Sequence, residues 1–478
     1  MGSTGPQRPR AGALPLEGAI PLEPDPETRA ALGAAAVTLV SRLIEARRSR
    51  SIFVPPRDGL IEEMRQPPSE DGAPTAELLV RLEEAALAGW NKTDGGDLAY
   101  IPNGALYSGV LAIMVAAGAH GYTGSAVEAP ALVAIEESVI RWMADLLGLP
   151  AGAGGILLSG GSLANQAAIV TARARFGDGA SDTPGDGTMY VSERVHHSVV
   201  KAARLAGVPD DRIRIVPADA SYRLDVAGLS TAIARDRAAG LRPFLVVAVA
   251  GSTDTGAVDP LGAIADVAAD AGAWLHVDAA YGGFFAMTER GQERFAGIER
   301  ADSVTLDAHK GLFLPYGVGA LIVRDPVTLI EAHAGHGAYL RDVPATDGLP
   351  HYFQMSPELT RPTRGLAVWL PLQLHGVGAF REALDRMLDL AELAAALLDA
   401  TDGVEIVARP ELSIVAFRAV QGDEATDRIQ RALNTSGRFH VSSTTLDDRA
   451  VIRLAFLNPA STQRHVEDVV DLIGRAAG

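Results

Sequence analysis

The stretches AWLHVDAAYGG at residues 273–283 and DSVTLDAHKG at residues 302–311 decide the predicted fold of this 478-residue chain. Each is a short apolar run that ends on an ionisable side chain, Asp278 in the first and Lys310 in the second. Five runs of the same kind alternate with alanine-rich segments of helical character: residues 154–159, 188–192, 213–218, 244–252 and 318–323. This alternation predicts an α/β fold with a mostly parallel central sheet and helices on both of its faces.

The rhythm of the sequence changes on both sides of this region, and four parts are expected. Residues 1–25 are rich in Pro and Gly and are expected to form a flexible arm. Residues 26–104 are expected to be a helical N-terminal segment that buries little surface alone and therefore packs on a second subunit. Residues 105–365 would be the large domain, and residues 366–478, with helices and four strand-like alternations, a small α+β domain.

The composition limits the classes of function. Lys and Arg number 42 and Asp and Glu number 59, so the net charge of −17 disfavours nucleic acid as a partner. No apolar run approaches a bilayer span and no signal peptide is recognised, so a cytosolic protein is expected, with no membrane partner. The absence of cysteine excludes disulfides and thiolate metal ligands, and no metal site is predicted. Only Lys92, Lys201 and Lys310 are available for lysine chemistry.

Polar residues follow the predicted strands at their carboxyl ends, which is where such sheets bind ligands. Taken singly, each has an ordinary structural explanation: a capped glycine turn at residues 160–162, a turn histidine, an Asp278 paired with an arginine or a backbone cap, or a surface lysine. Taken together, they supply what a pyridine aldehyde phosphate requires. Lys310 offers an amine for the aldehyde, Asp278 an acid for the ring nitrogen, the glycine turn an anion site, and His196 a flat neighbour.

HVDAAYGG followed by DAHKG resembles the pyridoxal-phosphate-dependent group II amino acid decarboxylases, which include aromatic amino acid and glutamate decarboxylases. The resemblance runs from about Gly89 to the C-terminus. It also rests on LAYIPNGALYSG, EAPALVAIEESVIRWM, SPELTRPTRGLAVW and RLAFLNPASTQRHVEDVVDLI. It implies a fold type I enzyme that uses pyridoxal 5'-phosphate (PLP) to decarboxylate an L-amino acid through a lysine Schiff base and a quinonoid intermediate. It also implies a homodimer whose active site lies at the subunit interface.

The same resemblance implies a role for each matching position. Lys310 would form the Schiff base, Asp278 would pair with the pyridinium nitrogen, and His196 rather than His197 would stack on the ring. Tyr352 would lie on a mobile loop and protonate the substrate carbon. Further residues are expected near the phosphate (Gly161, Ser162, Ser303, His309), along the ring (Thr253, Ala280) and around the substrate (Tyr100, Tyr122, Gly124).

Several positions depart from the pattern of the family. Asp307 stands where relatives often carry Asn near the phosphate, and Gly311 stands where aromatic amino acid decarboxylases carry Trp. Gly124 replaces a second aromatic residue, so an aromatic substrate is not assumed. Arg361 and Arg364 are expected either to bind a substrate carboxylate or to form salt bridges.

Alternative functions keep the same cofactor site. One is a PLP-dependent carbon–carbon lyase or a decarboxylating aldehyde synthase, and another is a cofactor-binding protein that has lost turnover. Tyr352 argues against the oxidative version, because relatives with that chemistry tend to carry Phe at the position.

Overall fold

The computed structural model describes residues 22–102, 104–177, 186–335 and 348–478, and the side chains of Arg48 and Ser49 are outside this description. The chain divides into two compact units. One contains the described residues up to Arg50 together with Val54–Gly89, and the other contains Ser51–Phe53 and Trp90–Gly478. The short strands β1 (Phe53–Val54) and β2 (Gly89–Trp90) lie where the chain passes between the units.

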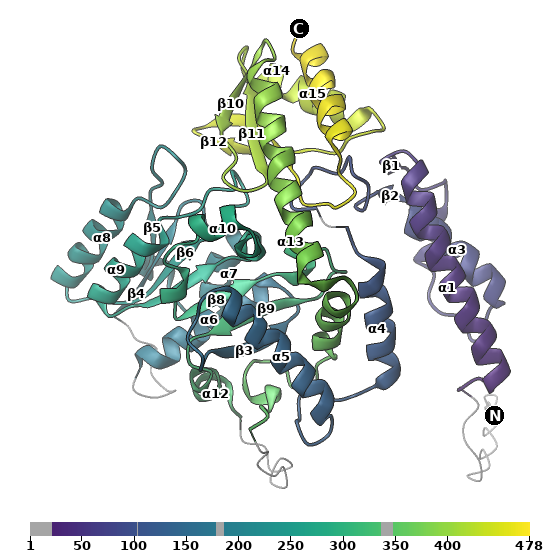
Figure 1. The fold of residues 1–478 in the computed structure, drawn as a ribbon, viewed down its shortest axis with the longest axis horizontal. Helices are drawn as coiled ribbons and strands as arrows, with labels where there is room; N and C mark the ends of the chain where they lie inside the picture. Colours follow the sequence, from purple (N-terminus) through teal and green to yellow (C-terminus); the bar gives the residue numbers. More distant parts are fainter. Residues whose placement is uncertain (1–21, 103, 178–185, 336–347) are drawn as a thin grey trace, which may run out of the picture. The chain divides into compact units, whose positions relative to one another are not determined.

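The first unit is helical and consists of α1 (Pro26–Ser49), α2 (Leu60–Met64) and α3 (Thr75–Leu87). The helix α1 begins where the sequence predicts it, because Pro26 fits the first helical turn and the Asp25 carboxylate accepts hydrogen bonds from Glu27 N and Thr28 N. It runs beside α3 (Figure 1). Apolar side chains of both helices remain exposed in this unit: Leu32, Val37, Leu78, Val80 and Leu82.

The second unit is built on a seven-stranded sheet. Its strands are β3 (Gly154–Leu158), β4 (Gly187–Ser192), β5 (Ile213–Val216), β6 (Arg242–Val249), β7 (Trp274–Asp278), β8 (Ser303–Leu306) and β9 (Gly319–Val323). They lie in the order β3-β9-β8-β7-β6-β4-β5, and only β9 runs antiparallel to its neighbours. The predicted α/β fold with a mostly parallel sheet is therefore confirmed, and every predicted strand of this region is present.

Helices cover both faces of this sheet, which explains why its strands are continuously apolar. In β4 and β6, Met189 and Leu245 pack in one core cluster with α6 and α7, whereas Tyr190 and Val246 pack on the opposite face with α8 and α9. The described helices of this region are α4 (Tyr107–Ala119), α5 (Pro130–Leu146), α6 (Gly161–Phe176), α7 (His197–Leu205), α8 (Val226–Ala238), α9 (Leu261–Ala271), α10 (Glu289–Arg294), α11 (Ala308–Gly311) and α12 (Val327–His333).

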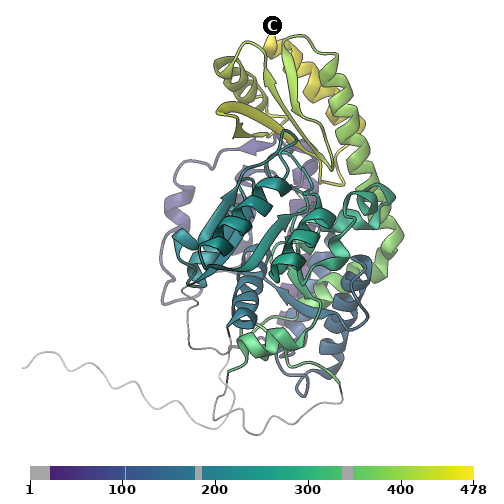
Figure 2. The same ribbon diagram turned by 90° about the vertical axis from the view of Figure 1, so that its left-hand side faces the viewer.

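The C-terminal part is the α+β arrangement that the sequence predicts. The strands β10 (Val404–Ala408), β11 (Ile414–Ala419), β12 (Ser442–Leu446) and β13 (Arg449–Ala455) form an antiparallel sheet in the order β10-β11-β13-β12. The helices α13 (Arg364–Asp399) and α14 (Asp423–Thr435) pack against it, and α15 (Gln463–Ala477) packs against these two helices (Figure 2). The sequence predicts two helical segments before this sheet, and the structure joins them into α13, with a break at Gly376 (φ 75°).

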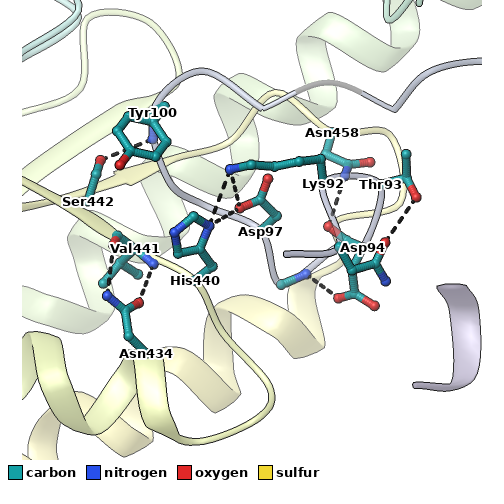
Figure 3. A network of polar contacts seen from close by, with 12 residues as sticks. Lys92, Thr93, Asp94, Asp97, Tyr100, Asn434, His440, Val441, Ser442 and Asn458 are labelled. Atoms are coloured by element: carbon teal, nitrogen blue, oxygen red, sulfur yellow. Dashed lines mark hydrogen bonds and ion pairs between the residues drawn. The ribbon is translucent and has the colours of Figure 1, made fainter. Parts of the chain in front are cut away.

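A segment near the start of the second unit is tied to this C-terminal sheet. Leu98 N donates to His440 O at 2.8 Å, and Ala455 N donates to Leu98 O at 2.9 Å. In the same region His440 and Lys92 both point at the buried Asp97 carboxylate (Figure 3). Residues 96–100 thus lie in the second unit, while the expected domain boundaries at residues 104 and 365 stay predictions. No helix in the described ranges is both long and apolar enough to cross a membrane.

Candidate active site

A cavity of about 410 Å³ lies at the carboxyl ends of the parallel strands, where the sequence places the ligand site. It is lined by residues that follow β3, β4, β6, β7 and β8. Eight of the residues expected at the cofactor line it: Gly161, Ser162, His196, Thr253, Asp278, Ala280, His309 and Lys310. Two other cavities, of about 530 and 560 Å³, are lined by no described lysine or histidine.

Lys310 enters the cavity from the short helix α11, directly after β8. Its ammonium nitrogen lies 2.9 Å from Oδ2 of Asp307, whose side chain is almost fully buried. The other oxygen of Asp307, Oδ1, is buried and has no hydrogen-bond partner among the described residues. The neighbouring Gly311 has no space for a side chain, because a Cβ atom there would lie 2.6 Å from Cβ of Phe284. This contact explains why a bulky residue is missing after the lysine.

Asp278 ends β7 with its carboxylate in a largely buried position. Its Oδ2 accepts a hydrogen bond of 2.9 Å from Nδ2 of Asn165, and its Oδ1 accepts one of 3.2 Å from Ala280 N. Within the described residues, no arginine or lysine forms a salt bridge with this carboxylate. A buried carboxylate that is held only by neutral donors is suited to pair with a cationic ligand group.

His196 is the N-cap of α7 and presents its ring to the cavity, whereas His197 is not among the lining residues. Ser198 N donates to Nδ1 of His196 at 3.3 Å, so the proton of the neutral ring lies on Nε2. Burial lowers the pKa of His196 below its usual range, which favours this neutral form. The side chain can therefore offer both a flat uncharged face and an Nε2–H donor.

The turn at residues 159–162 forms a cradle at the N-terminus of α6. Unpaired N–H groups and the positive end of the helix dipole favour an anion at this position. A Cβ atom on Gly161 would lie 3.0 Å from Oδ2 of Asp307, so only glycine leaves the space open. Nδ1 of His309 donates to Val318 O at 2.9 Å. Asp307 is the one acidic group of the cradle, and its ion pair with Lys310 offsets part of its charge.

These groups fit PLP: an amine, an acid held by neutral donors, an imidazole face and an anion cradle meet in one cavity. Ser303 does not belong to this set, although it was expected near the phosphate. Its hydroxyl group is fully buried and lies 2.8 Å from Nδ1 of His276, and it accepts a hydrogen bond from Nε1 of Trp274. The hydroxyl lies beside the His276 ring because Ser303 and His276 are direct partners in the register of β7 and β8.

Tyr352 is also placed away from the cavity. It is 1% exposed, in a short 3₁₀ helix (Tyr352–Gln354), and its ring centre lies 4.8 Å from the Arg361 guanidinium carbon. Burial raises the pKa of its hydroxyl well above the usual value. The expected role of Tyr352 as proton donor on a mobile loop conflicts with this buried position, because the side chain is packed in the core of its own chain.

Arg361 and Arg364 form salt bridges, which was one of the two expectations for them. The side chains of Arg361 and Glu136 are both fully buried and lie 2.6 Å apart, and Arg361 also donates to Leu157 O. Arg364 donates two hydrogen bonds to the Glu358 carboxylate. Both arginines also donate to Leu157 O, so they hold the loop that precedes α13 against β3.

The three residues expected around the substrate do not line the cavity of their own chain. Tyr100 is 63% exposed, and the Tyr122 hydroxyl donates to Leu359 O at 2.8 Å. Gly124 lies under the Tyr122 ring, where a Cβ atom would come within 2.3 Å of it. The Tyr122 ring thus fills the volume that a second aromatic residue would need.

The structure adds three buried polar residues that the sequence reasoning missed. Asn165 donates a hydrogen bond to Asp278, and His276 in turn contacts Asn165. Arg453 donates only to neutral oxygens, those of Asp254, Ser442 and Tyr100. For Asn165 a signal existed, because it lies one helical turn after Gly161. For His276 the signal was its position two residues before Asp278, on the same face of a strand.

Fold and cavity together define the class of fold type I PLP-dependent enzymes. Residues 90–420 match the family model described as pyridoxal-dependent decarboxylase conserved domain. The chain belongs to this family, and it is a PLP-dependent carboxy-lyase that acts on an amino acid.

Individual relatives agree with this assignment. An aromatic-L-amino-acid decarboxylase from Bacillus atrophaeus is 33% identical over 383 residues, which cover 78% of this chain and 79% of that protein. An L-2,4-diaminobutyrate decarboxylase from Rhizobium meliloti (strain 1021) is 34% identical over 357 residues, which cover 73% and 71%. The crystal structure of Oryza sativa TDC with PLP and tryptamine superimposes with a TM-score of 0.90 at 27% identity, covering 96% of this chain and 99% of that one.

Proposed function

We propose that the cavity around Lys310 and Asp278 is where the chain converts an L-amino acid to its amine and CO₂. The observation that supports this proposal is that Lys310, Asp278 and His196 line one cavity together with the glycine–serine cradle. When bound, PLP supplies an aldehyde that accepts an amine and a protonated ring that takes up the electron pair released with CO₂.

Each side chain then has a separate task. Lys310 provides the amine. The Asp307 carboxylate lies close enough to form an ion pair with this amine when it is protonated and not bound to the cofactor. Asp278 holds a proton on the ring nitrogen by presenting a negative charge to it. The cradle at residues 159–162 orients the phosphate. These assignments rest on position in the cavity and on the chemistry of each group.

His196 is the group placed to move a proton at the substrate carbon. Its Nδ1 accepts from Ser198, and no acceptor for Nε2–H is found within the described residues, so Nε2–H can donate to a ligand in the cavity. Tyr352 is not given this task here, because its ring packs against Arg361 in the core. Tyr339, another tyrosine of the same region of the sequence, lies outside the described residues.

The proposal includes a homodimer with its active site at the subunit interface. The helix α4 has no charged residue, and it exposes Ile113, Met114 and Val115, each at 42% or more. An exposed apolar face of this kind is typical of an interface between subunits. In a dimer, Tyr122 would approach the cavity of the other subunit. Measurement of the molar mass in solution by light scattering tests this, because a monomer at micromolar concentration would contradict it.

The experiment for the activity combines a product screen with two matched lysine variants. The PLP-loaded protein is offered aromatic, aliphatic, acidic and basic L-amino acids, and CO₂, amine, aldehyde and peroxide are quantified. We expect CO₂ and amine in equal amounts for at least one substrate. Aldehyde with peroxide would instead indicate an aldehyde synthase, and no product from any substrate would indicate a protein without turnover.

The variants test the assignment of the lysine. Borohydride reduction should attach PLP to Lys310, and Lys310→Ala should lose both this label and the visible absorbance band of the cofactor. Lys201→Ala is the control, because Lys201 is exposed on α7 and does not line the cavity. A label that persists in Lys310→Ala would refute the assignment.

A further inference from the structure

A chain of hydrogen bonds between side chains leads from Trp274, which is partly buried at the start of β7, to Asp278. Nε1 of Trp274 donates to Oγ of Ser303 at 2.8 Å, and Oγ of Ser303 lies 2.8 Å from Nδ1 of His276. Nε2 of His276 lies 3.0 Å from Oδ1 of Asn165, whose Nδ2 donates to Oδ2 of Asp278 at 2.9 Å. We call these residues, from Trp274 to Asn165, the Asp278 relay.

Elementary hydrogen-bond chemistry fixes the direction of the relay. An indole N–H can only donate, so Oγ of Ser303 accepts from Trp274 and has its own O–H left for Nδ1 of His276. His276 then carries its proton on Nε2 and donates it to the carbonyl oxygen of Asn165. The amide NH₂ of Asn165 is left facing Asp278, and a carboxylate can only accept. The indole at one end and the carboxylate at the other therefore require the same direction of donation, from Trp274 toward Asp278.

The surroundings keep the relay in this state. Asn165, His276 and Ser303 are each at most 1% exposed, so water does not compete for their hydrogen bonds. Burial lowers the pKa of His276 to about 4, which keeps its ring neutral near pH 7. His276 also lies within 3.5 Å of the Thr305 hydroxyl, the other polar side chain that contacts it.

The relay is built into the fold by the spacing of its residues. Trp274, His276 and Asp278 alternate along β7 and lie on one face of the strand. Ser303 is the direct partner of His276 on β8, and Asn165 comes from the first turns of α6. Strand order and helix packing thus set all four contacts, and none of them depends on a loop.

We propose that the Asp278 relay positions the carboxylate of Asp278 and stabilises its negative charge, so that the ring nitrogen of PLP keeps its proton. This inference rests on the proposed role of Asp278. Asn165 and Ala280 N occupy one acceptor site on each carboxylate oxygen, which leaves the remaining lone pairs for the ring nitrogen. Ser303 and Trp274 act only through His276, so they are positioning residues.

The experiment uses holoenzyme loaded with PLP labelled with ¹⁵N at the ring, and the ring ¹⁵N shift reports the proton directly. We expect Asn165→Leu to move this shift toward the unprotonated value and to weaken PLP binding about 10- to 100-fold, because a hydrogen bond to a charged group is lost. Ser303→Ala should act in the same direction by a smaller amount, about 3- to 10-fold, since His276 is then free to turn. Ser303→Thr keeps the hydroxyl and should restore the shift.

Each outcome decides a separate question. One outcome is that borohydride still attaches PLP to Lys310 but neither Asn165→Leu nor Ser303→Ala moves the ring ¹⁵N shift. This outcome would refute the proposed role of the Asp278 relay and would leave the proposed active site unchanged. If the wild-type protein shows no PLP on Lys310, the proposed function fails first. Should Asn165→Leu not fold, Ser303→Ala and Trp274→Phe carry the test, because neither residue lines the cavity.

Discussion

Replacement of Asp307 by Asn removes the one acidic group of the anion cradle. The Asp307 carboxylate is 2% exposed and pairs with Lys310 at 2.9 Å, and its second oxygen has no hydrogen-bond partner in the part of the chain that the structure describes. A phosphate bound over Gly161 would lie near this carboxylate, and two like charges about 6 Å apart repel by about 3 kcal/mol at an effective dielectric constant of about 20. Since the ammonium group of Lys310 offsets part of this repulsion, about 1–2 kcal/mol remains, or roughly 5- to 30-fold in affinity.

The assay titrates the cofactor-free variants with PLP and with pyridoxal, which lacks the phosphate. In Asp307→Asn the amine of Lys310 loses its ion pair and becomes more available to either aldehyde. The repulsion acts on the phosphate alone, so the ratio of the two dissociation constants should change by the stated factor in favour of PLP. Asp210→Asn is the control, because it changes the net charge equally at an exposed position. An unchanged ratio in Asp307→Asn would refute the reasoning.

The other predictions concern the core and the pH dependence. Arg361→Met leaves the buried Glu136 carboxylate unpaired and should lower the free energy of unfolding by about 3–5 kcal/mol, whereas adding Glu136→Gln should restore part of it in denaturant titrations. Tyr352→Phe keeps the ring on Arg361 and should leave kcat within about twofold of the wild-type value. A decrease in kcat of a hundredfold or more would show that the Tyr352 hydroxyl takes part in the reaction. The pKa of His276 is about 4 in the fold against about 6.5 when unfolded, so its contribution to stability is present above pH 6.5 and is lost as the pH falls toward 4. Histidine ¹⁵N spectra should show its ring still unprotonated at pH 5.

The sequence predicts the sheet and most of the cavity because each strand is a continuous apolar run that is followed by polar residues at its carboxyl end. Lys310, Asp278 and His196 follow strands that are adjacent or nearly adjacent in the sheet, so their meeting needs only a parallel arrangement. The packing of Ser303 was not predicted, although Ser303 begins β8 at the end of the strand opposite to Lys310. Its environment depends on the register with β7, which no pattern in the sequence states.

The buried position of Tyr352 was not predicted for a different reason, and its role in the reaction stays a prediction. The resemblance to the family predicts a tyrosine on a loop, and this region of the sequence holds several aromatic residues. Whether such a residue is packed depends on Arg361 and Glu136, whose pairing spans 225 positions of the sequence. Asn165 and His276 were missed because the role of a buried polar residue cannot be inferred until its hydrogen-bond partners are known.

The hydrogen bonds that join Leu98 to His440 and Ala455 have a consequence for any engineering of this enzyme. These bonds and a single parallel bridge between Asp97 and His440 join the stretch that leads to Tyr100 to the C-terminal part, although more than 300 residues separate the two in the chain. Deleting the last hundred residues would therefore also remove the hydrogen bonds that hold the backbone of Tyr100 to Ser442 and Arg453. A shortened enzyme could keep its PLP cavity and still lose this neighbouring surface.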